Sequence, residues 1–169
     1  MNQTSYNMLK KIHLELKWSI NFGIAYLLWI ILEKSCGLHD QHIANYPLYS
    51  NGFILVTVVL FYVALLDKRK NVYRGEMTQT NGFLTGLVLT LFISLLTPFL
   101  IRISLQYITP DFFIHIKENM ITSKKMTANQ AELFYNYKSY LLQTLFLNFS
   151  LGILCSAIFS FVLTTKKTT

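Results

Sequence analysis

The sequence predicts an all-α integral membrane protein, a single domain over residues 1–169 with four transmembrane helices and an extracytoplasmic helical hairpin between the third and the fourth. Four long stretches contain no Asp, Glu, Lys or Arg: 18–32, 41–66, 77–101 and 139–165. A helix crosses the hydrocarbon layer with ~20 mostly apolar residues and pairs its own backbone groups, as lipid requires. The composition agrees, because only 14% of the residues are charged, against about 25% in soluble proteins.

The first helix is expected at about 18–34. An apolar run behind several lysines could also open a signal peptide, but Glu33 and Lys34 spoil the small-residue cleavage pattern, so we expect the segment to be retained. Its uncharged run is short for a bilayer. Either Lys17 and the Glu33–Lys34 pair snorkel to the membrane surface, or the helix extends back through 12–16.

The second, third and fourth helices are expected at about 48–66, 83–103 and 141–163. Pro47 suits the entry to the second helix, because the first turn does not need the N–H that proline lacks. Pro98 lies near the far end of the third helix, where it predicts a kink.

The connection at about 109–140 is the one sizeable segment outside the predicted spans. Thr109 is expected to cap a helix that starts with Pro110, and Thr127 to open a capping box for a second helix that could continue into the fourth span. Four apolar residues then share one helical face: Phe112, Phe113, Ile116 and Met120. We expect this segment to cover the end of the bundle, and the alternative is a docking surface formed by Phe112, Phe113, Lys124 and Lys125.

Basic residues indicate the orientation. The net charge is +7, and the Lys and Arg residues are denser before the first span, between the second and third spans and after the fourth. The positive-inside rule therefore predicts that both termini are cytoplasmic, with Lys68 in the strongest anchoring cluster. Because these charges lie beside span ends and anionic lipid, the lipid bilayer is the expected partner and nucleic acid is not.

Several local patterns resemble one bacterial family. The basic turn Tyr73-Arg74-Gly75 leads to Asn81-Gly82-Phe83, Pro110-Asp111-Phe112 opens the later helix, and a long charged segment precedes the last span. With four spans, this arrangement resembles the uncharacterised membrane proteins called domain of unknown function 4199. The resemblance implies a bacterial cytoplasmic membrane and four helices, and it implies no catalytic residues.

Candidate ligands and thiols are few. His39, Asp40 and His42 lie close in sequence, and His115 could join them, but two histidines without a specified third ligand indicate a solvated loop rather than a zinc or copper site. Cys36 and Cys155 are expected to be free thiols, with Cys155 packed as a small apolar residue. No metal or cofactor is expected.

Small residues predict close helix packing. Gly82 and Gly86 are four residues apart at the start of the third span, and a row of four steps along the fourth: Asn148, Gly152, Ser156 and Ser160. Such faces let helix backbones approach closely. We expect the fourth span to pack against the first or third, and the alternative is contact with a second copy or another subunit.

These observations predict a non-catalytic interaction or accessory component of a bacterial inner-membrane complex. The alternative is a small oligomeric transporter or channel, which the lack of charged residues within the spans disfavours. An enzyme is not expected, because the available acids and bases do not form a catalytic spacing: His13, Glu15, Asp111 and His115.

Overall fold

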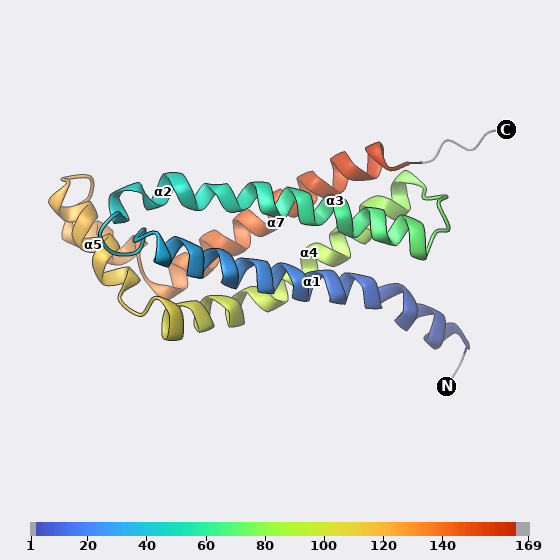
Figure 1. Ribbon diagram of the computed structural model, residues 1–169, viewed down its shortest axis with the longest axis horizontal. Coiled ribbons are helices and arrows are strands. Elements are labelled where there is room, and N and C mark those ends of the chain that lie inside the picture. The colour runs from blue at the N-terminus through green and yellow to red at the C-terminus, as the bar shows by residue number, and fades with distance from the viewer. Residues whose placement is uncertain (1–2, 165–169) are drawn as a thin grey trace. The chain divides into compact units, whose positions relative to one another are not determined.

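The computed structural model describes the backbone of residues 3–164 and the side chains of residues 12–164. The side chains of Lys10 and Lys11, and all of Lys166 and Lys167, which contribute to the predicted orientation, lie outside the described residues. Within the described range every regular element is helical, as predicted (Figure 1). The α-helices are α1 (Gln3–Ser35), α2 (Tyr46–Tyr49), α3 (Phe53–Asn71), α4 (Gln79–Ile103), α5 (Phe112–Thr122), α6 (Ala128–Phe134) and α7 (Tyr137–Val162).

Four helical segments in the described residues are long and apolar enough to cross a membrane: Ile12–Ser35, Ile43–Asn71, Gln79–Ile108 and Tyr137–Val162. The first segment therefore begins before the uncharged run at 18–32, in agreement with the alternative in which the helix extends back through 12–16. The second begins with a 3-10 turn at Ile43–Asn45 and continues through α2, a second 3-10 turn at Ser50–Gly52 and α3. The third ends in a π-helical turn at Ser104–Ile108. Large side chains on these helices are exposed, for example Leu28 at 59% and Phe161 at 73%, as expected for helices that lipid covers.

The segment between α4 and α7 differs in part from its prediction. Thr127 does form a capping box, since Gln130 N donates to its hydroxyl over 3.3 Å and Thr127 N donates to the Gln130 side chain over 2.9 Å. The cap expected at Thr109 was wrong, because α5 begins after Asp111, which makes no side-chain capping bond.

The continuous helix expected from α6 into α7 was also wrong, because α6 ends at Phe134 and α7 begins at Tyr137. Asn136 lies in the bend between them. Its side-chain oxygen accepts a hydrogen bond from Ser139 N over 3.0 Å, and its side-chain nitrogen donates to Glu132 O over 3.0 Å. The amide therefore satisfies backbone groups that the two helix ends expose.

The chain forms two compact units, and α1, α3, α4 and α7 each contribute residues to both. The first unit takes residues up to 22, 55–95 and from 147 onward, and the second takes 23–54 and 96–146. Buried residues of the first unit include Phe61, Leu65, Met77, Thr90 and Ser156. The second unit has an apolar cluster, which we call the second-unit core: Ile43, Phe112, Ile116 and Met120.

Candidate functional site

The second unit contains a buried carboxylate, Glu33, in the last turn of α1. Glu33 is only 3% exposed. Trp29, one helical turn earlier on the same face, donates its Nε1–H to Glu33 Oε1 over 2.7 Å. His39 Nε2 lies 3.2 Å from Glu33 Oε2. Of the two alternatives for the first span, snorkelling does not apply to Glu33, because its carboxylate is directed inward and contacted by two ring nitrogens.

The turn after α1 brings His39 back onto Glu33. Gly37 has a φ of +72°, a conformation that glycine adopts without steric cost, and its carbonyl accepts a hydrogen bond from His42 N over 2.8 Å. His39 is 5% exposed, and its ring lies 5.3 Å from that of Tyr46 and 5.2 Å from that of Phe112. The solvated loop predicted for this sequence is therefore wrong at His39.

The other two histidines that were considered as metal ligands, His42 and His115, do not meet at the Glu33–His39 contact. His115 Nδ1 lies 2.9 Å from the His39 carbonyl oxygen and 2.9 Å from Asp40 Oδ1, so His115 does come close to the turn. His42 is exposed, and its ring lies apart from the Glu33 carboxylate. Among the described residues no three His, Cys, Asp or Glu side chains form a group that could hold a metal ion.

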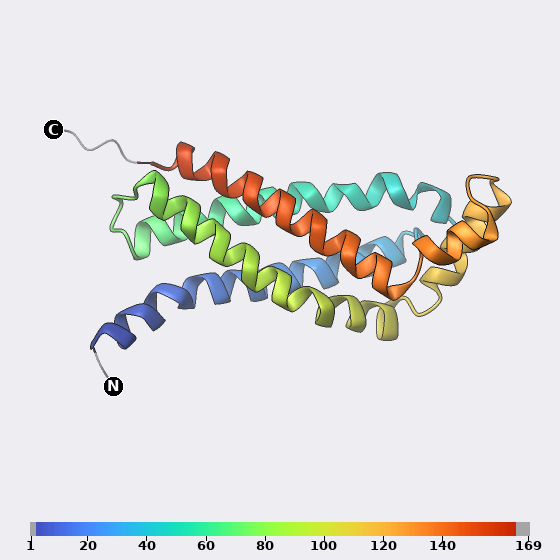
Figure 2. The same cartoon turned by 180° about the vertical axis from the view of Figure 1, so that it is seen from behind.

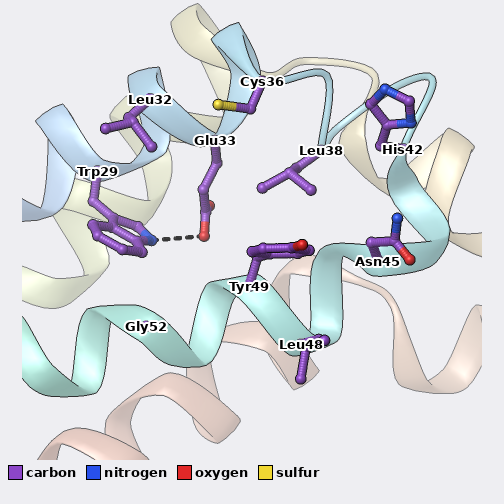
Figure 3. Close-up of a pocket in the computed structure, with 10 residues that line it drawn as sticks. All are labelled: Trp29, Leu32, Glu33, Cys36, Leu38, His42, Asn45, Leu48, Tyr49 and Gly52. Carbon is purple, nitrogen blue, oxygen red and sulfur yellow. Dashed lines mark hydrogen bonds between the residues drawn. The ribbon is translucent and has the colours of Figure 1, made fainter.

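A pocket of about 570 Å³ opens beside Glu33 (Figure 3). Figure 3 shows the Glu33 carboxylate between the side chains of Trp29 and Tyr49. Gly52 forms part of the wall, and a Cβ at this position would lie 3.0 Å from the Trp29 ring, so glycine leaves room for the indole. The full lining is Trp29, Leu32, Glu33, Cys36, Leu38, His42, Asn45, Leu48, Tyr49 and Gly52. The pocket is therefore largely apolar, with one buried carboxylate.

The first unit has its own buried charges. Lys68 Nζ on α3 donates to Glu15 Oε1 on α1 over 2.6 Å, and both side chains are at most 6% exposed. Beside them Asp67 Oδ2 accepts from Trp18 Nε1 over 2.8 Å and from Lys17 Nζ over 3.2 Å. Within the basic cluster that was predicted to anchor the orientation, the Lys68 ammonium is therefore buried against a carboxylate.

The small residues of α4 and α7 face one another within the first unit, where Figure 2 shows α7 alongside α4. A Cβ added at Gly86 would lie 2.2 Å from Ser156 Oγ, and one at Gly152 would lie 2.3 Å from Thr90 Oγ1. A Cβ added at Gly82 would lie 3.1 Å from the Cα of Ser160. The two rows thus meet in antiparallel register, and Asn148, half-buried, lies one further step along α7.

The residues suggested as a partner surface divide into buried and exposed sets. Phe112 is 3% exposed within the second-unit core, and Phe113 is half-buried against it. Phe112 therefore does not lie on a free surface, because the apolar face of α5 is covered by its own chain. Lys124 and Lys125 are exposed in the turn that follows α5.

A family model described as "Protein of unknown function (DUF4199)" matches residues 17–165. The chain belongs to this family. No curated protein and no solved structure matches it. The resemblance noted from the sequence is therefore confirmed, and it supplies the family without an activity.

In this DUF4199 protein, sequence reasoning missed the Glu33–His39 contact and the Glu15–Lys68 pair. One local signal could have pointed to Glu33: Trp29 and Glu33 are four residues apart, and a helix places them on one face. The partners His39 and Lys68 could not be assigned in the same way, because a turn and a different helix supply them. Thr90 was also missed, because a threonine opposite a glycine has no distinctive sequence pattern. Cys36 and Cys155 are free thiols, as predicted.

Proposed function

We propose that this protein is a non-catalytic accessory component of a membrane assembly and that its α5–α6 segment contacts the partner. The observation that supports this is a basic turn beside an exposed apolar depression. The depression, about 390 Å³, is lined by Lys125, Met126, Gln130, Leu133 and Phe134. Leu133 is 67% exposed and Phe134 is 44% exposed. A partner segment with an apolar side chain next to Asp or Glu fits this combination.

The segment is well suited to hold such a surface in place. Ile116 and Met120 of α5 are 0% and 5% exposed in the second-unit core, and Ala131 of α6 is 0% exposed. A salt bridge of 2.7 Å between Lys117 Nζ and Glu132 Oε2 also joins the two helices. Because the apolar face is already ordered, binding on the other side needs little further ordering of the segment.

Charge reversal tests the proposal. The double variant Lys124→Glu, Lys125→Glu should strongly reduce recovery of co-purifying proteins from mild detergent, measured by quantitative mass spectrometry. Lys138→Glu is the matched control, since it reverses another exposed lysine of the second unit outside the depression. Equal recovery from the double variant and the control, with both proteins folded, would reject this surface.

A second candidate function is transport by an oligomer, and one observation favours it. Glu33 is a buried carboxylate beside a pocket, and carriers place such ionisable groups within their helical regions. Native mass spectrometry that finds only copies of this chain, together with solute flux into proteoliposomes that Glu33→Gln abolishes, would support the transporter over the accessory component.

We also propose that the protein lies in a bacterial cytoplasmic membrane with both termini on the cytoplasmic side. The support is the density of Lys and Arg in the segments that would face the cytoplasm. Cysteines introduced at Arg69 and Lys124 should react with an impermeant maleimide from opposite sides of sealed vesicles, in a background where Cys36 and Cys155 are serine. Labelling of both from one side would reject this topology.

A further inference from the structure

We propose that the Glu33 pocket binds an organic ammonium cation that carries an apolar body. The pocket measures about 570 Å³, which lies within the range of ~300–1,000 Å³ typical of small-molecule sites. Such sites combine apolar walls with a few placed polar groups, and here the main polar group is a carboxylate. The inference concerns the second unit alone and does not depend on a partner at the α5–α6 segment.

The charge of the site indicates a cation. Trp29 and His39 supply ring nitrogens to Glu33, and among the described residues no Lys or Arg nitrogen lies within 4.0 Å of its carboxylate. Lys34, the next residue along the chain, donates instead to the carbonyl oxygen of Ile108. An ionised carboxylate that is buried without a cation is costly, so a ligand that brings one gains from this contact.

The His39 side chain is the second polar neighbour of the Glu33 carboxylate. Its Nε2 faces Glu33, while its Nδ1 is buried with no hydrogen-bond partner in the described part of the chain. A buried ring nitrogen without a partner is uncommon in folded proteins, so the polar contacts of the Glu33–His39 pair are incomplete without a further group.

Aromatic side chains complete a site for an ammonium group. Tyr49 lies on the other side of the carboxylate from Trp29, and the face of such a ring attracts a cation, most strongly when water is excluded (Figure 3). Trp29 itself presents its N–H edge to Glu33. Leucines of the lining offer contact to an apolar body: Leu32, Leu38 and Leu48.

Other ligand classes fit less well. An anion would face Glu33 directly. An inorganic divalent ion would require several oxygen or nitrogen ligands, and among the described residues no three His, Cys, Asp or Glu side chains form a group that could hold one. An ammonium group takes much of its affinity from aromatic and apolar contacts, which this pocket supplies.

Fluorescence of Trp29 gives a direct test. The chain has two tryptophans, so Trp18→Phe leaves Trp29 as the reporter. This full-length background, in a non-ionic detergent, is titrated with benzyltrimethylammonium and with phenylmethanesulfonate, which has the same ring and the opposite charge. We expect a saturable change with the ammonium probe and none with the sulfonate.

Two variants locate the binding. Glu33→Gln keeps an acceptor for Trp29 and removes the charge, and it should weaken ammonium binding at least tenfold. Tyr49→Leu removes an aromatic wall from a side chain that is 56% exposed, so the fold should not depend on it. It should weaken binding about threefold. Tyr107→Leu is the matched control outside the pocket, at 73% exposure, and should bind as the background does.

Nanodiscs distinguish the two sources of an ammonium group. If a lipid headgroup occupies the site, discs of phosphatidylethanolamine and phosphatidylglycerol should weaken binding of the probe relative to discs in which an uncharged glycolipid replaces the phosphatidylethanolamine, at the same phosphatidylglycerol content and therefore the same surface charge. If the ligand is a free amine, the two kinds of disc should give the same affinity. Absence of saturable ammonium binding, equal binding of the sulfonate, or unchanged affinity in a folded Glu33→Gln protein would overturn the proposal.

Discussion

Replacing Gly86 by alanine should strongly destabilise the first unit. The added Cβ would lie 2.2 Å from Ser156 Oγ, 2.6 Å from its Cβ and 3.0 Å from its Cα. Carbon atoms in ordinary contact are ~3.5–4.0 Å apart, so α4 and α7 would have to separate by roughly 1 Å here. A rotation of the Ser156 side chain cannot relieve the clash, because it moves Oγ but leaves Cβ and Cα in place.

The size of the effect follows from the register of the two helices. Overpacking costs about 1–3 kcal/mol, and we expect the upper part of that range because separation at Gly86 also loosens the contacts at Gly152 and Gly82. A loss of about 2–3 kcal/mol corresponds to a ~30- to 150-fold fall in the folding equilibrium constant. Gly82→Ala should cost less, since its nearest neighbours lie at 3.0 Å and 3.1 Å.

The assay is unfolding of the purified protein by sodium dodecyl sulfate in mixed micelles, followed by circular dichroism. Gly23→Ala is the matched control, because its new Cβ would meet only the flexible end of Leu100, at 3.2 Å. Adding Ser156→Gly to Gly86→Ala should recover part of the loss, since it removes two of the three clashing atoms. A Gly86→Ala protein that unfolds at the same detergent fraction as Gly23→Ala would refute the close approach of α4 and α7.

Three further changes test other contacts. Glu15→Ala should cost about 3–5 kcal/mol, because it removes the carboxylate from the buried Lys68 ammonium. The double variant Glu15→Leu, Lys68→Met should cost less than Glu15→Ala in the same unfolding assay. A double variant no more stable than Glu15→Ala would contradict this account. Thr127→Ala should cost about 1 kcal/mol and speed hydrogen exchange of the first α6 amides, and unchanged exchange would show that the capping box does not hold this end. Lys124 has a φ of +56°, so Lys124→Gly should raise the stability by up to about 1 kcal/mol and Lys124→Val should lower it. The two variants should shift the midpoint of thermal unfolding in opposite directions.

The length and apolarity of the four long helices could be predicted from the sequence because lipid imposes them locally. A spanning segment must be long, apolar and internally hydrogen-bonded, so each uncharged run carries its own evidence. The capping box at Thr127 is local in the same way, since its two partners are three residues apart.

The sequence by itself thus determined the helical class, the four long segments, the family and the rows of small residues on the third and fourth spans. Only the tertiary structure decided which row met which, that Glu33 and Lys68 are buried, and that His39 turns back onto α1 while His42 stays exposed. The physical reason is that a charged residue beside an apolar run has the same local sequence pattern whether its side chain snorkels or is buried. The outcome depends on a donor or counter-charge that folding brings from a distant part of the chain.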